Sequence, residues 1–175
     1  MRRDNRGFTL IELMLVVAIL GVISAITVPG LMRARMSANH ASAIASMRGI
    51  ASAQAVYAAS AAGGGYATLL PTLGTTCPGS FEPFLSPDLT WGNNVTKSGY
   101  FITMAPSLGG VAMPADCNGM PSFSGYYASG VPVSLGSTGQ KGFAVNQEGS
   151  IWQDLTGLAP TEPFAEVPPD ITIIQ

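Results

Sequence analysis

The stretch GFTLIELMLVVAILGVISAITVPGLM, residues 7–32, decides how this chain is built. Glu12 is its only charged residue, and the run from Leu13 to Met32 can span a hydrocarbon core of about 30 Å as a helix. A removable secretory signal has a shorter apolar core that ends at a small-residue cleavage site, and no such site precedes Pro29. The stretch therefore predicts a membrane helix that is kept.

The charged residues are few and unevenly distributed. They make up 10% of the chain, which is low for a soluble domain. Arg2, Arg3 and Arg6 precede the apolar run and favour a cytoplasmic N-terminus, although Arg33 and Arg35 at its other end weaken this bias. No basic patch follows later in the chain, so nucleic acid is not expected as the main partner.

Glu12 is the informative residue of the apolar stretch. An ionised carboxylate inside a bilayer is unfavourable unless it finds a partner. Two interpretations stay open on spacing alone. Either Glu12 meets an opposite charge in an assembly, or it lies close enough to the interface for its side chain to reach the headgroups.

The sequence RGFTLIE (residues 6–12), followed by an apolar run with Gly21 and Pro29, resembles the N-terminus of type IV prepilins and type II secretion pseudopilins. The resemblance implies that prepilin peptidase cuts between Gly7 and Phe8 and then N-methylates Phe8. It also implies that Glu12 pairs with the N-terminal amine of a neighbouring subunit during assembly.

The same resemblance implies a location, partners and a structural function. The precursor would be a single-pass inner-membrane protein with its body outside the cytoplasm. An assembly platform would then move it into a filament of identical and related subunits, periplasmic or on the cell surface. Major pseudopilins carry an Asp-Pro-Trp-Gly run, and residues 89–92 read Leu-Thr-Trp-Gly instead. Pilus or secretion pseudopilus therefore stays open, as does a minor tip subunit that binds a surface, DNA or a secreted substrate.

Pro29 lies within a pattern that otherwise continues as a helix. Proline removes one backbone hydrogen bond and contacts the preceding turn, so a kink or local unwinding is predicted over residues 25–29. Gly21 and Gly30 loosen the same region. A simple bend is the alternative, whereas the resemblance implies a loss of helix between Gly21 and Pro29 in a packed filament.

The segment after the apolar run is predicted to be an amphipathic helix, residues 33–62, which covers the core of the body. Its apolar residues recur at helical spacing, and glycines 63–65 end it. The predicted organisation is a leader (1–7), a membrane and assembly helix (8–32), this helix, and a β-rich domain (63–175). The stripe comprises Met36, Ala43, Met47, Ile50 and Tyr57.

The rest of the chain predicts an antiparallel sheet packed on the C-terminal half of the helix, an α+β fold. Residues 100–104 and 125–128 have strand character, and residues 141–154 predict a hairpin that turns at 147–149. The resemblance implies the ladle-shaped architecture of pilins. The proline-rich tail from Pro160 onward is expected to be extended and largely unpaired.

Cys77 and Cys117 are the two cysteines of the chain. If the body is exported, a disulfide between them is expected, and closing its loop would stabilise the fold by roughly 3–4 kcal/mol. Two buried free thiols are the alternative.

No catalytic set is present in the sequence, and neither an enzyme nor a cofactor is expected. His40 is the single histidine and has no cysteine or acid near it, so a surface or subunit-contact position is predicted. Asp116, Glu148 and Asp154 offer carboxylates for calcium, but their spacing matches no known calcium loop, and no metal site is predicted. A membrane-anchored enzyme would need a catalytic set that this sequence does not show.

Overall fold

The computed structural model describes residues 8–164 and 169–174. The chain divides after Arg35 into an N-terminal unit and a body. The helix α1 (Leu10–Ser60) begins in the first and continues into the second.

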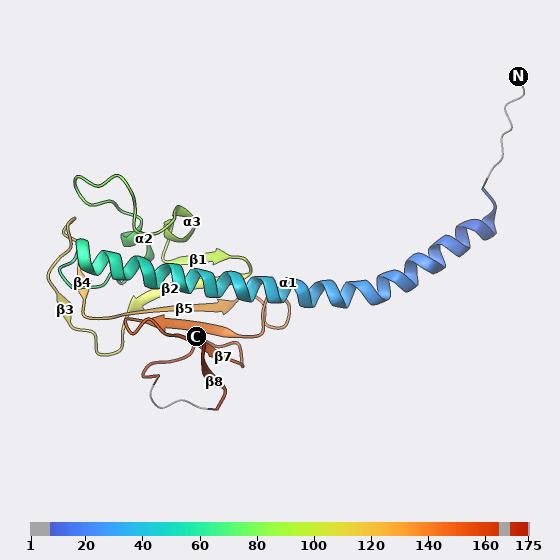
Figure 1. Cartoon of the computed structure of the whole chain (residues 1–175). Coiled ribbons are helices and arrows are strands. Elements are labelled where there is room, and N and C mark those ends of the chain that lie inside the picture. Colours follow the sequence, from blue (N-terminus) through green and yellow to red (C-terminus); the bar gives the residue numbers. More distant parts are fainter. Residues whose placement is uncertain (1–7, 165–168, 175) are drawn as a thin grey trace, which may run out of the picture. The chain divides into compact units, whose positions relative to one another are not determined.

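In the N-terminal unit, α1 is continuous through Gly21 and Pro29 (Figure 1). The local unwinding predicted over residues 25–29 is therefore wrong for the single chain. The physical reason is that Pro29 removes only the bond to the Ala25 carbonyl and leaves those on either side in place. Thr27 adds a bond, since its hydroxyl donates to the Ile23 carbonyl at 2.8 Å. Loss of helix on packing into a filament stays a prediction.

The glycines after α1 end the helix as predicted. Gly63 and Gly64 have φ angles of 56° and 99°, in the left-handed region that favours glycine. The Gly64 N–H turns back to donate to the Ala58 carbonyl at 2.8 Å. This bond satisfies a carbonyl that the helix end would otherwise leave free.

The body combines the second half of α1 with two short helices and two antiparallel sheets. The larger sheet has the strand order β1-β2-β5-β6-β7-β8, and β3 pairs with β4 separately. This arrangement confirms the predicted α+β class. The elements are α2 (Leu70–Leu73), α3 (Pro87–Thr90), β1 (Asn94–Lys97), β2 (Tyr100–Pro106), β3 (Ala112–Met113), β4 (Ser122–Phe123), β5 (Tyr126–Pro132), β6 (Gly142–Asn146), β7 (Ile151–Asp154) and β8 (Ile171–Ile174).

The predicted strands correspond to β2, β5 and the β6–β7 hairpin. The expectation of a largely unpaired tail is wrong, because β8 pairs with β7 from Ile151 opposite Ile174 to Asp154 opposite Ile171. The prolines before Ile171 end at Pro169, and the ITII run that follows has the β-branched composition of a strand. Pairing with β7 also satisfies its backbone groups.

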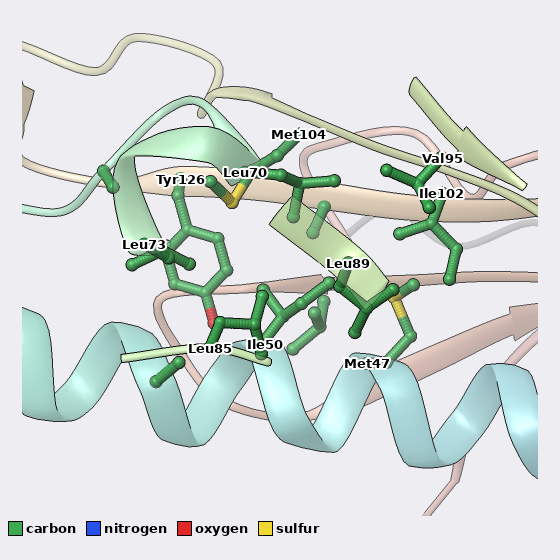
Figure 2. Close-up of a cluster of buried hydrophobic side chains, with 14 of the residues drawn as sticks. Met47, Ile50, Leu70, Leu73, Leu85, Leu89, Val95, Ile102, Met104 and Tyr126 are labelled. Atoms are coloured by element: carbon green, nitrogen blue, oxygen red, sulfur yellow. The ribbon is translucent and has the colours of Figure 1, made fainter. Parts of the chain in front are cut away.

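From Ala43 to Tyr57, the stripe on α1 packs against the sheet and the short helices, as predicted, whereas Met36 is only partly buried and is not part of the core. Met47 and Ile50 extend from α1 toward the side chains of the body, and both are fully buried (Figure 2). The core they join includes Ala43, Tyr57, Leu70, Leu73, Leu89, Val95, Tyr100, Ile102, Met104, Tyr126, Phe143 and Val145.

A polar residue of α1, Gln54, is also fully buried. Its amide forms two bonds with the backbone of Ala67: the Ala67 N–H donates to Oε1 at 3.0 Å, and Nε2 donates to the Ala67 carbonyl at 2.6 Å. A buried amide needs such partners. Gln54 therefore attaches the segment that follows α1 to the helix.

The structure gives one salt bridge in the part of the chain that it describes, between Lys97 Nζ and Asp88 Oδ2 at 2.7 Å. Hydrogen bonds from Lys97 and Ser86 lower the pKa of Asp88. Both side chains are partly exposed to water, where such a pair contributes little to stability. Apolar packing, hydrogen bonds and the Cys77–Cys117 disulfide therefore hold the body together.

Candidate assembly site at the start of the helix

The N-terminus of α1 is closed by a capping box of Thr9 and Glu12. Thr9 directly precedes the helix, and its hydroxyl accepts a bond from the Glu12 N–H at 3.3 Å. In return, the Thr9 N–H and hydroxyl donate to Glu12 Oε2 at 3.0 and 2.7 Å. Two backbone N–H groups that the helix cannot pair internally are satisfied in this way.

Glu12 thus has a local partner as well as its predicted partner in a neighbouring subunit. Both bonds that the carboxylate accepts go to Oε2, which leaves Oε1 without a hydrogen-bond partner within residues 8–164 and 169–174. A carboxylate in the first turn also interacts favourably with the helix dipole. Thr9 was not among the predicted site residues, although T-x-x-E spacing ahead of an apolar run indicates a capping box.

Phe8 is the first residue that the structure describes, and its side chain is 86% exposed. Gly7, on the other side of the predicted cleavage point, lies outside the described residues. Cleavage and methylation at this position therefore stay predictions from the sequence.

The apolar residues from Phe8 to Met32 have no cover in the single chain. Every large apolar side chain among them is between 47% and 86% exposed. This part of α1 is long and apolar enough to cross a membrane. Lipid or other apolar helices are needed to remove this surface from water.

At the other end of α1, Cys77 and Cys117 form the predicted disulfide, with their Cα atoms 5.6 Å apart. A hydrogen-bond cluster lies beside it. The Tyr57 hydroxyl donates to Asp116 Oδ2 at 2.9 Å, and Asp116 Oδ1 accepts from the backbone of Asn118 at 2.8 Å. Burial and the Asp116 carboxylate raise the pKa of Tyr57 well above its ordinary value. The disulfide therefore lies beside side chains that hydrogen bonds hold in place.

His40 is partly exposed and also contacts its own chain, so the expected surface or subunit-contact position stays a prediction. Its Nε2 accepts the backbone N–H of Gln140 at 3.1 Å. Its ring lies edge-on to Tyr100 and Phe143, with centroids 6.0 Å away in each case. Burial and the nearby Lys141 lower the pKa of His40. These contacts join α1 to residues a hundred positions away, which no local pattern indicates.

The stability of the body is expected to fall at acid pH because of His40. A lowered pKa means that the unfolded chain binds a proton more readily than the folded chain. The free energy of unfolding should therefore decrease as the pH falls through the ordinary histidine value of about 6.5. Urea unfolding across this range tests the prediction, with His40→Gln as the control that removes the dependence. The prediction is contradicted if the free energy of unfolding changes equally with pH in the parent and in the variant.

The three carboxylates considered for calcium do not form one site. Asp116 is bound in the cluster described above, and Asp154 Oδ1 accepts from the N–H and hydroxyl of Thr156, both at 2.6 Å. Glu148 is exposed in the β6–β7 turn. Across the residues that the structure describes, no three His, Cys, Asp or Glu side chains are placed to hold a metal ion.

Comparison with known proteins identifies the N-terminal segment. Residues 2–28 match the family model described as the prokaryotic N-terminal methylation motif. No curated protein and no solved structure matches the chain.

Proposed function

We propose that this chain, which carries the N-terminal methylation motif that is the hallmark of type IV pilins and pseudopilins, is a structural subunit that polymerises through the first half of α1. One observation carries the proposal. Glu12 is the single carboxylate of an apolar helical segment whose large side chains are all exposed. Such a segment needs other apolar groups to cover its side chains and one positive charge to pair with Glu12.

The chemistry of this segment supports a register role for Glu12. Cleavage after Gly7 would create an amine at Phe8, about one helical turn from Glu12 along the chain. A buried charge without a partner costs several kcal/mol, whereas a matched pair roughly breaks even. The pair between neighbouring subunits would therefore select the register in which they pack.

The driving force for polymerisation would be transfer of the apolar helix from lipid into a bundle of like helices. Packing and charge matching decide such an association, since lipid is as apolar as the helices. Each subunit would use different surfaces toward its two neighbours, and this geometry extends into a fibre rather than closing into a ring.

Location and partners follow from the same proposal. Residues 1–7 would be the leader, residues 8–32 the single membrane span, and the body would lie outside the cytoplasm. The disulfide supports this orientation, because such bonds persist in oxidising compartments. Partners would be prepilin peptidase, an inner-membrane assembly platform, lipid, and other copies of this chain or related subunits, whether in a pilus or in a secretion pseudopilus.

A tip subunit with a binding function is the second candidate. It is favoured by two aromatic side chains that take no part in the core, Phe81 at 97% and Trp91 at 73% exposure. Abundance separates the two candidates, because a main subunit must be plentiful in filaments and a tip subunit scarce.

The proposal is tested by intact mass and N-terminal sequencing of the native protein from membranes and from sheared filaments. The expected chain begins at Phe8 and carries one added methyl group. The control is a Gly7→Leu variant, which should keep its leader and stay in the membrane fraction. A native chain that begins at Met1, or after Pro29, would contradict the proposal.

A further inference from the structure

One end of the body is bonded to the first turns that α1 makes within it. Two connections of the larger sheet meet there, the β1–β2 turn and the β5–β6 loop. Asn39 Nδ2 donates to the Thr138 carbonyl at 2.8 Å, in the loop between β5 and β6. The Ser42 hydroxyl donates to that of Ser98 at 2.8 Å, in the β1–β2 turn. The bond from Gln140 to His40 adds a third point of attachment.

The same end carries exposed leucines. Leu135, in the β5–β6 loop, is 63% exposed; Leu155 and Leu158, after β7, are 47% and 68% exposed. We call these three residues the leucine patch. The two loops that carry them are adjacent in space, because Leu135 packs so closely on Gly157 that a side chain at position 157 would collide with it. Gly157 in turn lies between the other two leucines in sequence.

The loops that carry the patch suit an apolar surrounding. Residues 133–140 and 155–160 contain no charged residue. Their backbone groups are bonded within tight turns: the Gly136 N–H donates to the Gly139 carbonyl at 2.7 Å, and the Thr156 N–H to Asp154 at 2.6 Å. Paired backbone groups reduce the cost of leaving water.

The position of this end along the chain indicates what covers the patch. Asn39 follows Met32, the last residue of the apolar run, by seven residues, which is two turns of helix or roughly 10 Å. Arg33 and Arg35 lie in these two turns and are exposed. Basic residues beside a span are attracted to anionic headgroups.

We propose that the leucine patch rests on the membrane and inserts its side chains at the lipid interface while α1 anchors the chain. The inference rests on the proposed membrane anchoring by residues 8–32. In this state the body is held against the bilayer at the Leu135 and Leu158 loops as well as by α1. Incorporation into a filament then requires the patch to leave the lipid.

A second copy of the chain fits the patch less well. Stable protein interfaces bury about 800 Å² on each partner with matching shape. Three leucines on two loops present far less, and lipid requires no complementary shape. Apolar side chains of interfacial segments reach roughly 5–10 Å into the headgroup and acyl boundary.

Tryptophan quenching in the full chain tests the proposal. Leu158→Trp is reconstituted in vesicles of phosphatidylethanolamine and phosphatidylglycerol that contain lipid brominated close to the headgroup. Its added emission should fall by about half if the side chain reaches this boundary. The matched control is Leu108→Trp, which is similarly exposed at 73% but follows the opposite end of β2, and should be unaffected. The parent chain measures the contribution of Trp91 and Trp152.

A third variant separates this inference from the membrane anchoring. Val22→Trp lies in the apolar run and should be quenched by lipid brominated near the chain ends. If Val22→Trp is quenched but the Leu158→Trp and Leu108→Trp variants lose equal fractions of their added emission, the leucine-patch proposal is overturned and the anchoring stays in place. No quenching of Val22→Trp would overturn both. A third result is that the emission of Leu158→Trp depends on protein concentration in detergent and not on the lipid. That result would assign the patch to a second copy of the chain and overturn the proposal.

Discussion

The Glu12→Gln variant is expected to be cleaved and folded normally but to be lost from filaments by at least about 100-fold. Glutamine keeps the size of the side chain and an oxygen for Thr9, and removes only the charge. Breaking a buried pair costs about 3–5 kcal/mol because the other charge is left alone, and each 1.4 kcal/mol is a factor of about ten. The measurement is the amount of subunit in sheared filaments relative to the membrane fraction, with Glu12→Ala as a second loss of the carboxylate.

The capping box provides the matched control. Thr9→Val removes the hydroxyl that binds Glu12 Oε2 and leaves the carboxylate in place. If Glu12 acts between subunits, this variant should still form filaments, since losing a cap costs only about 1 kcal/mol. Glu12 would be a capping residue only if Thr9→Val failed as severely as Glu12→Gln. Normal filaments from Glu12→Gln would end the register proposal outright.

Replacing both cysteines with serine is expected to reduce the free energy of unfolding by about 3–4 kcal/mol. Cys77 and Cys117 are 40 residues apart, so their bond removes much of the freedom of the unfolded chain. In the folded body it ties the loop that carries Phe81 to the connection between β3 and β4. Urea unfolding followed by tryptophan emission measures the loss.

Reduction of the parent chain should reproduce this loss, because serine and a reduced cysteine leave the same loop open. Reductant should have no effect on the double-serine variant, which controls for other actions of the reagent. A difference of less than about 1 kcal/mol between parent and variant would show that the ordered cluster around Asp116 holds this end without the covalent bond.

Local patterns made much of the fold predictable. The period of 3.6 residues placed Met47, Ile50 and Tyr57 on one face of α1, and the structure buries all three. Alternation and turn residues marked the β6–β7 hairpin. The cysteine pair left one possible intrachain bond. Each of these inferences needed only neighbours in the sequence or a count.

The features that the sequence did not predict depend on residues far apart. The pairing of β8 with β7 depends on the register of two strands that a proline-rich connection separates. His40 and Gln54 are polar residues whose partners come from other segments, so their burial does not follow from their own position. The leucine patch exists because Leu135 and Leu158 lie in different loops that the sheet brings together. Of the two outcomes predicted at Pro29, a kink or local unwinding, the unwinding does not occur in the single chain, because one missing bond does not break a long helix.

The scarcity of ion pairs has a consequence for the surroundings in which the body works. Lys97 and Asp88 form the one salt bridge in the described part of the chain, and both are open to solvent. Dissolved ions screen exposed charges but leave apolar packing nearly intact up to moderate concentrations. The free energy of unfolding of a body stabilised in this way is expected to change little with salt concentration over this range.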